Sequence, residues 1–390
     1  MENLIYLDNA ATAWPKPPHV YEFMTEFYRK SGVNPGRSGF DMAISAGNLV
    51  ENTRARLTKF FNGDSPERMV FTYNATDGLN LIINGIVKPG DHVISTNVEH
   101  NSVIRPLNHL RRDGVAEVTF IPFNTEGFID PDDVAKAFRP KTKLVIVNHG
   151  SNVIGTIQDL KAIGKTAKEH GAIFAVDCSQ TAGVVKIDMK AMNIDVLAFT
   201  GHKAMMGPTG IGGVCVREGI EIAITRSGGT GVRSAYPYHL EEYPYRLEAG
   251  TLNLLGIAGL WAGQDWMDEQ GLDNIREHEQ KLAKKFVHAV SDIEGLILYC
   301  CRSLENHLST ISVNVDGVEA MNTGIMLDVD HNIAVRTGLH CAPLVHQQLG
   351  TTEIHGSVRF SIGAFNTEEH IDAAIEALEE ISKNAPKNRH

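Results

Sequence analysis

The sequence predicts an α/β protein with a large, mainly parallel sheet followed by a smaller α+β part. Seven short apolar runs recur between about residues 65 and 217, and helix-like stretches separate several of them. The pattern changes after about Leu255, where longer amphipathic stretches begin. Strands that alternate with helices form parallel sheets covered on both faces. We therefore expect a seven-stranded sheet in the first part of the chain.

The seven runs are almost continuously apolar, as strands buried on both faces should be. In chain order they read RMVFT, HVIST, EVTFIPF, KLVIVNH, AIFAVD, DVLAFT and GIGGVCV. The stretches DGLNLIINGIV and DLKAIGKTAKEHG lie between runs and are typical of helices.

Beyond the sheet region, residues 254–271 and 275–293 have the apolar periodicity of helices. Two strands are expected at 309–315 and 357–362, and a last helix at 367–383. No linker rich in proline, glycine or serine precedes them, so we expect a helix to bridge two packed domains. The expected division is a large domain over 15–255 and a small α+β domain formed by 1–14 and 256–390.

Composition narrows the class of protein. The 390 residues carry a formal net charge of -11, which argues against direct, sequence-independent nucleic-acid binding. The N-terminus has no signal-peptide pattern and no apolar stretch is long enough to span a bilayer, so we expect a cytoplasmic protein without a membrane partner. The five cysteines are Cys178, Cys215, Cys300, Cys301 and Cys341. None forms a C-x-x-C pair, so no metal site is expected.

The clearest chemical signal is the segment AFTGHKAMMGPTGIGG, which places Lys203 just after a buried strand and before a glycine-rich turn. Open α/β sheets bind ligands at the carboxyl ends of their strands. A solvated surface lysine is the alternative, and the glycines disfavour it because they let the backbone approach a ligand. A nucleotide phosphate loop is disfavoured because its G-x-x-x-x-G-K-[ST] order is absent.

Two further segments point to the same edge of the sheet. AIFAVDCSQTAG ends a strand in Asp177 and places Gln180 three residues later. VFTYNATDGLNLIINGI leads from a strand into a helix whose first turn holds Thr76, which suits a phosphate. Either segment alone also fits an ordinary helix cap.

His100 in STNVEHNS and Asn152 in VNHGSNVIGT follow two more strands. A loop histidine is usually only solvated, so each signal is weak alone. Together, polar residues follow four strands at one edge of one sheet, the last at the turn from Thr200 to Lys203. Such convergence predicts a cofactor site.

These residues resemble pyridoxal-phosphate enzymes of fold type I, and more narrowly the class V aminotransferase relatives that include cysteine desulfurases and selenocysteine lyases, group II-like. The segments YLDNAAT, EAGTLN and RTGLHCAP are similar to motifs of that family, in the family's order, and the resemblance covers nearly the whole chain. It implies pyridoxal 5'-phosphate as cofactor and the large-plus-small domain architecture of fold type I.

The resemblance also implies roles for single residues. Lys203 is the implied covalent attachment point of the cofactor, Asp177 the partner of its ring nitrogen, and His100 a catalytic residue stacked on the ring. The implied contacts of the ring hydroxyl and phosphate are Asn152, Gln180, Thr76, Asp77, Thr200 and His202. Thr251 is implied to reach the phosphate from the other subunit of a homodimer.

For the substrate, the resemblance implies that Arg359 binds the α-carboxylate, with Arg336, Asn9 and Asn152 also contributing. Cys341 is the implied nucleophile that attacks the sulfur of L-cysteine. The implied products are L-alanine and a persulfide on Cys341, which a mobile loop would offer to a sulfur-acceptor protein.

Two alternatives stay open. In one, the chain is a selenocysteine lyase or another class V aminotransferase or lyase, and Cys341 is not catalytic. In the other, the fold is kept without catalysis, which Lys203, Asp177 and His100 disfavour. The chain also departs from the group II pattern of two histidines before the cysteine, because it carries Leu339 and His340 there.

Overall fold

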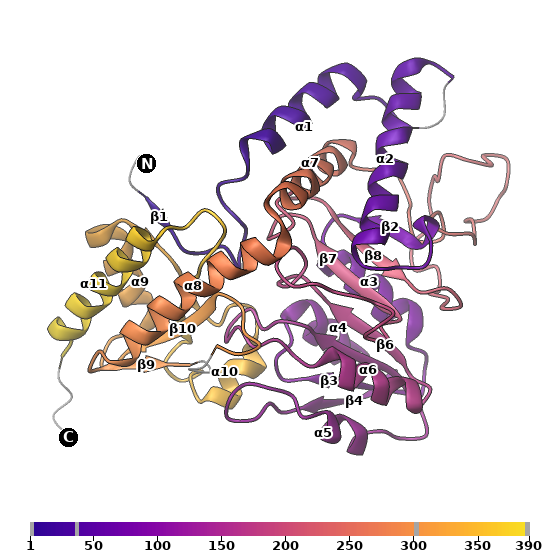
Figure 1. The fold of residues 1–390 in the computed structure, drawn as a ribbon. Coiled ribbons are helices and arrows are strands. Elements are labelled where there is room, and N and C mark those ends of the chain that lie inside the picture. Colours follow the sequence, from indigo (N-terminus) through magenta and orange to yellow (C-terminus); the bar gives the residue numbers. More distant parts are fainter. Residues whose placement is uncertain (1–3, 36–38, 300–303, 387–390) are drawn as a thin grey trace.

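The computed structural model describes residues 4–35, 39–299 and 304–386. They form a large body around one sheet and a smaller body, joined by two long consecutive helices (Figure 1). Cys300 and Cys301 lie outside the described residues. No helix in the described part of the chain is long and apolar enough to cross a membrane.

The large body contains the predicted seven-stranded sheet, in the order β2-β8-β7-β6-β5-β3-β4. Its strands are β2 (Met69–Thr72), β3 (Asp91–Thr96), β4 (Ala116–Ile121), β5 (Thr142–Asn148), β6 (Ile173–Asp177), β7 (Val196–Thr200) and β8 (Gly212–Val216). Each predicted apolar run is one of them. β8 runs antiparallel to β2 and β7, and the remaining pairs are parallel. The expectation of a mainly parallel sheet is confirmed.

Helices cover both faces of this sheet because alternate strand residues point to opposite sides. Val70, Ala198 and Val214 pack on one side with α3 (Ala75–Ile86) and α4 (Asn101–Arg112). Their neighbours Met69, Phe199 and Cys215 pack on the other. The helices of that side are α2 (Asp41–Phe60), α5 (Pro131–Lys136), α6 (Leu160–Glu169) and α7 (Leu254–Gln270). Cys178 and Cys215 are fully buried there, as small apolar side chains.

The small body holds an antiparallel sheet in the order β12-β13-β10-β9. Its strands are β9 (Leu296–Leu298), β10 (Thr310–Val315), β12 (Arg336–Gly338) and β13 (Ser357–Ser361). A parallel pair joins β1 (Ile5–Tyr6) to β11 (Ile333–Ala334). The helices are α8 (Leu272–Ser291), α9 (Ala320–His331), α10 (Pro343–Leu349) and α11 (Glu368–Asn384). The predicted strands correspond to β10 and β13.

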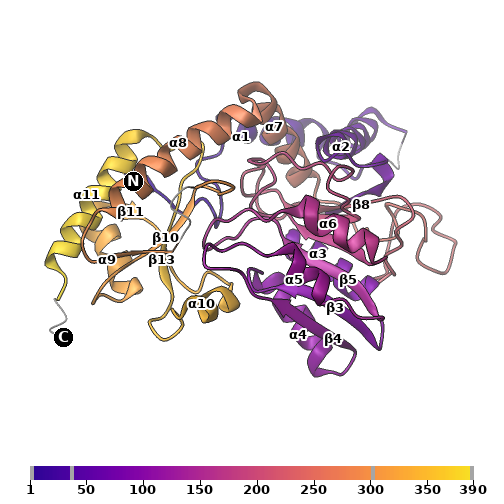
Figure 2. The same cartoon turned by 60° about the horizontal axis from the view of Figure 1, so that its bottom comes forward.

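The expected bridge between the bodies is the consecutive pair α7 and α8, which meet at Gly271 with a φ of 79°. α7 packs on α1 (Pro18–Ser31) and α2, whereas α8 packs on α11 (Figure 2). We propose the domain division 15–255 against 1–14 and 256–390. The pairing of β1 with β11 supports it, because it ties the N-terminal segment to the small body.

Candidate active site

A cavity of about 180 Å³ opens where β5, β6 and β7 end and where α3 and α4 begin. Three distant parts of the chain line the cavity: residues 10–11, 74–203 and 336–359. The residues of the middle part come together because the carboxyl ends of parallel strands meet at one edge of the sheet. The predicted site residues among them are Thr76, His100, Asn152, Asp177, Gln180, Thr200, His202, Lys203, Arg336 and Arg359.

Lys203 lies in the turn after β7, with its amine in this cavity. Burial lowers the pKa of this amine to about 8, against an ordinary value of 10.5. The negative charge of Asp177 opposes the shift, and the guanidiniums of Arg359 and Arg336 add to it. A larger fraction of the amine is therefore deprotonated at neutral pH, the form in which an amine attacks an aldehyde.

Asp177 ends β6 as a buried carboxylate. Its Oδ1 accepts hydrogen bonds from the Ser179 backbone N–H at 2.9 Å and from the Ser179 hydroxyl at 2.5 Å. These donors fix its orientation in the cavity. The arrangement suits a carboxylate that binds a cationic ring nitrogen.

A chain of hydrogen bonds joins the first turns of α3 and α4. The Thr76 hydroxyl lies 2.7 Å from the Ser102 hydroxyl, which lies 2.8 Å from His100 Nδ1. Burial, followed by the nearby Lys203 ammonium, lowers the pKa of His100 to about 4. The imidazole is therefore neutral at pH 7 and presents an uncharged ring to the cavity.

Several buried polar atoms around the cavity have no hydrogen-bond partner among the described residues. They include Thr200 Oγ1, His202 Nδ1 and Asn152 Oδ1. Buried polar groups are normally paired, so such atoms at one cavity point to a polar ligand. The N-terminus of α3 adds backbone N–H groups suited to a phosphate. With the amine of Lys203 and the carboxylate of Asp177, this set fits pyridoxal phosphate.

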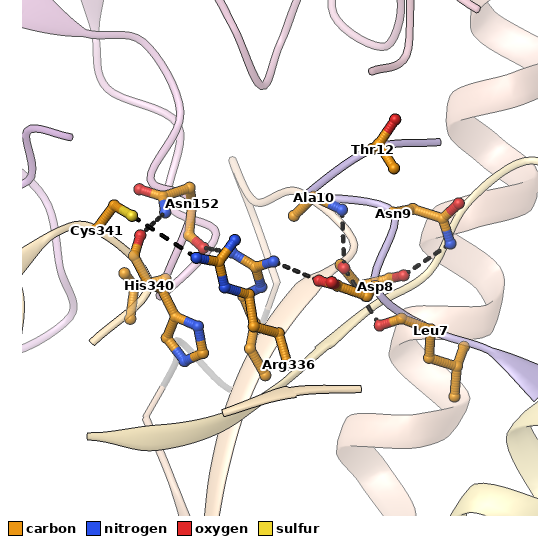
Figure 3. A network of polar contacts seen from close by, with 12 residues as sticks. Leu7, Asp8, Asn9, Ala10, Thr12, Asn152, Arg336, His340 and Cys341 are labelled. Carbon is orange, nitrogen blue, oxygen red and sulfur yellow. Dashed lines mark hydrogen bonds and ion pairs between the residues drawn. The ribbon is translucent and has the colours of Figure 1, made fainter. Parts of the chain in front are cut away.

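The N-terminal segment closes one side of the site. Arg359 Nη2 donates to Asp8 Oδ1 at 2.5 Å, and Arg359 Nη1 donates to the Asn152 carbonyl at 2.9 Å. Arg336 lies opposite Arg359 on the neighbouring antiparallel strand. Figure 3 shows this network reaching from Asp8 to Cys341. Two guanidiniums beside one paired carboxylate leave room for a second carboxylate, as an amino acid would bring.

Cys341 lies in a short turn between β12 and α10. His340 and Cys341 both have positive φ, at 47° and 59°, a conformation that residues other than glycine rarely adopt. Arg336 Nη2 lies 3.6 Å from Cys341 Sγ (Figure 3). Strained backbone at a thiol next to a guanidinium is typical of a functional position.

Two contacts hold this turn to the large body. The Asn101 N–H donates to the Cys341 carbonyl at 2.7 Å, and Asn152 Nδ2 donates to the His340 carbonyl at 2.6 Å. These bonds join the Cys341 turn to the large body. That the turn moves to deliver sulfur stays a prediction.

Four predicted residues do not line the cavity: Cys341, which follows the lining residue His340, and Asp77, Asn9 and Thr251. Asp77 faces away, caps the Tyr73 N–H and pairs with Arg226 at 2.7 Å. Asn9 is engaged with the Ser361 carbonyl at 2.9 Å. Thr251 is exposed beside a second cavity.

The sequence did not predict a role for some residues that lie at the site. Asp8 belongs to the YLDNAAT motif, but no role was predicted for it. Glu99, the residue before His100, is a fully buried carboxyl. Lys16 Nζ donates to the His202 carbonyl at 2.6 Å, which the Thr12 hydroxyl also reaches at 3.0 Å. In the sequence, these residues are marked only as charged residues within or near a motif. No group that could hold a metal ion occurs among the described residues.

Comparisons with known proteins agree with this site. A model of the family described as aminotransferase class-V matches residues 5–374. A probable cysteine desulfurase of Methanothermobacter thermautotrophicus is 35% identical, over 97% of this chain and 94% of the relative. A cysteine desulfurase of Escherichia coli O157:H7 is 34% identical, over 97% and 94%.

Solved structures give the same result. The apo structure of the cysteine desulfurase of Thermococcus onnurineus NA1 matches with a TM-score of 0.88 and 35% identity, covering 98% of this chain and 95% of that one. The cysteine desulfurase CsdA of Escherichia coli, in an S-sulfonic acid form, matches with a TM-score of 0.88 and 27% identity, covering 98% and 96%. The predicted resemblance and fold class are confirmed.

Proposed function

Because the chain belongs to the class-V aminotransferase family, we propose that it is a pyridoxal-phosphate-dependent cysteine desulfurase that converts L-cysteine to L-alanine. The observation that carries this proposal is the position of Cys341. Its thiol lies 3.6 Å from the Arg336 guanidinium, and Arg336 lines the same cavity as Lys203. A nucleophilic thiol at an amino-acid site is what removal of sulfur from cysteine requires.

In this proposal the chain's residues hold the cofactor in defined ways. Lys203 would bind its aldehyde carbon, Asp177 would pair with its ring nitrogen, and His100 would lie against its ring. Thr76, Thr200 and His202 would hold its phosphate, and Asn152 and Gln180 its ring hydroxyl. Asp77 would support these residues indirectly. Its carboxylate pairs with Arg226 and accepts a hydrogen bond from the Tyr73 N–H, just before α3. When bound, pyridoxal phosphate supplies an electron sink that weakens the bonds around the substrate Cα.

The substrate is positioned by its carboxylate. Arg359 binds that carboxylate, and the Arg336 guanidinium lies beside it. Asn152 and Asn9 contribute to the substrate site. The Lys203 amine, as a base in the cavity, would take the Cα proton. The Cys341 thiolate then attacks the substrate sulfur, so that a new S–S bond forms while the bond from sulfur to Cβ breaks. The electron pair of that bond stays with the carbon fragment, and protonation by the cavity residues yields L-alanine. Cys341 keeps the sulfur as a persulfide.

The proposed enzyme is a homodimer in which Thr251 reaches the phosphate of the other subunit. The exposed position of Thr251 supports this, as do exposed apolar residues on nearby segments. Those residues are Phe40, Met42, Ile44, Val232, Tyr236 and Tyr238. Sedimentation analysis tests the dimer, and Thr251→Ala should weaken cofactor retention. A cytoplasmic location stays a prediction.

The decisive experiment compares wild type with Cys341→Ala. Purified wild type should absorb as a pyridoxal-phosphate protein, and borohydride should fix the cofactor on Lys203. With L-cysteine and a reductant, wild type should release alanine and sulfide in equal amounts, whereas Cys341→Ala should keep the cofactor and lose both products. Full activity of that variant would instead favour a lyase or aminotransferase in which Cys341 takes no part. Running L-selenocysteine in parallel separates the two possible substrates.

A further inference from the structure

We propose that an apolar surface beside Cys341 is the docking site of a sulfur-acceptor protein that presents a cysteine on an apolar segment with a basic rim. We call this surface the acceptor face. It consists of Met321, Ile325, Val329, Leu339 and Ile354. The inference rests on the proposed function and names the kind of partner that function requires.

The acceptor face begins with a stripe on α9. Met321, Ile325 and Val329 recur every four residues and are 63%, 53% and 73% exposed. The opposite side of the helix, with Thr323 and Leu327, is buried against the small body. A surface helix normally turns polar residues to solvent. Three large apolar side chains in a row on its outer side are typical of an interaction site.

The stripe continues to the cysteine turn. Gly324 lies so close to Thr337 of β12 that an added Cβ would overlap the Thr337 side chain. With about 100° per residue, Met321 lies about 60° and Ile325 about 100° around α9 from Gly324, away from the buried side, so the stripe begins at the edge of α9 next to β12. β12 leads directly into Leu339, which is 37% exposed and stands two residues before Cys341.

The loop after α10 completes the acceptor face. His355 Nε2 lies 3.5 Å from Glu319 Oε1 at the start of α9, which places the exposed Ile354 beside that helix. Gly356 packs on the Gly338 backbone so closely that no side chain fits between them. This loop therefore lies between the start of α9, through His355 and Glu319, and the end of β12, through Gly356 and Gly338.

The turn that carries Cys341 is bonded to the large body at two points. Asn101 and Asn152 donate hydrogen bonds to the Cys341 and His340 carbonyls, so in this structure the acceptor has to come to the thiol. Any protein whose cysteine reaches the Cys341 persulfide must cover Leu339 and its neighbours. Leu339 stands where the group II pattern has the first of two histidines. An apolar contact between Leu339 and the acceptor would explain this difference.

Acidic residues on and beside α9 favour a basic partner. Asp328 and Asp330 are exposed on α9 next to the stripe, and Glu319 stands at its start. Complementary potentials favour a partner with lysine or arginine around its apolar contact. α9 lies at the far end of the molecule from α2 in both views, so the acceptor face is separate from the proposed dimer surface (Figures 1 and 2).

The transfer at this face balances without an added oxidant or reductant. The acceptor thiolate attacks the outer sulfur of the Cys341 persulfide. A bond forms between the acceptor sulfur and that outer sulfur, the bond from Cys341 Sγ to it breaks, and Cys341 leaves as a thiolate. The acceptor's proton goes to solvent, and the acceptor carries the new persulfide.

The test uses two synthetic peptides with one cysteine each, flanked by leucine and lysine in one and by serine and glutamate in the other. Alanine formation and peptide persulfide are measured with each peptide and with dithiothreitol. In Ile325→Lys the ratio of the leucine–lysine peptide rate to the dithiothreitol rate should fall about ten-fold, as expected when one buried apolar side chain is lost and a like charge is added.

Ile297→Lys is the matched control, because Ile297 is also exposed but lies on β9, the edge of the small sheet opposite β12. It should leave the ratio unchanged. Equal ratios in wild type and Ile325→Lys would overturn the acceptor face. So would a change in the mass of the Ile325→Lys assembly in sedimentation, since a second copy would then cover the stripe. Lack of alanine formation even with dithiothreitol would overturn the proposed function itself, and the acceptor face with it.

Discussion

Asp8 Oδ1 lies 2.5 Å from Arg359 Nη2, so the guanidinium expected to bind the substrate carboxylate is already paired with a carboxylate of the N-terminal segment. Arg359 is almost fully buried, and Arg336 faces it across β12 and β13. Asp8 therefore balances part of a positive cluster until a second carboxylate arrives. The N-terminal segment thus contributes to the electrostatics of the site as well as to its wall.

Asp8→Asn should destabilise the protein, because it leaves a buried guanidinium without its counter-charge. Breaking a buried pair of this kind costs about 3–5 kcal/mol, and the partial exposure of Asp8 favours the lower end. Thermal unfolding measures the loss. L-alanine, whose carboxylate replaces the missing charge, should restore more thermal stability to Asp8→Asn than it adds to wild type. Equal shifts would show that Asp8 does not share a subsite with the substrate carboxylate.

Capture of pyridoxal phosphate by the apoenzyme should accelerate as pH rises through about 8, the lowered pKa of Lys203. The deprotonated amine is the reactive form, so the rate follows its fraction. Asp177 raises this pKa, so Asp177→Asn should move the midpoint below 8. Stopped-flow absorbance provides the rates. A midpoint near 10.5 in wild type would show that the amine is not buried as described.

Arg336→Met should slow alkylation of Cys341 by iodoacetamide at pH 7.5 by about ten-fold, because the thiolate loses a charge-assisted contact at 3.6 Å. Arg336→Lys keeps the positive charge and should retain most of the rate. Mass spectrometry of the labelled peptide gives the rate at this thiol alone. An unchanged labelling rate in Arg336→Met would show that the Arg336 guanidinium does not increase the reactivity of the Cys341 thiol.

Glu99→Gln should flatten the pH dependence of stability between about 4.5 and 8. Burial raises the pKa of Glu99 to about 8, whereas in the unfolded chain it titrates near 4.5. The folded state therefore binds more protons in this window, and its stability, complete below 4.5, is lost as pH rises toward 8. The amide keeps the acceptor for the Asn148 N–H at 2.9 Å. Denaturant titrations at several pH values measure the slope, with the exposed Glu126→Gln as control.

The main sheet could be predicted because most of its strands are nearly continuous apolar runs and several of them are separated by periodic helices. Lys203, Asp177 and His100 could be placed at one edge because parallel strands end together. β9 and β12 were missed, since three residues show no periodicity. Asp77 was predicted to contact the cofactor, and its pairing with Arg226 could not be predicted because Arg226 is distant in sequence and no local pattern marks it.

The sequence by itself determined the sheet, the polar residues at its edge and the presence of a thiol in a glycine-bearing segment. Only the tertiary structure decided that Asp8 pairs with Arg359 within the small body, and that Asn101 and Asn152 of the large body bond to the Cys341 turn. The first contact joins the two ends of the chain, and the second depends on how α7 and α8 set one body against the other. Local periodicity does not encode that packing, because it reports only which face of each element is buried.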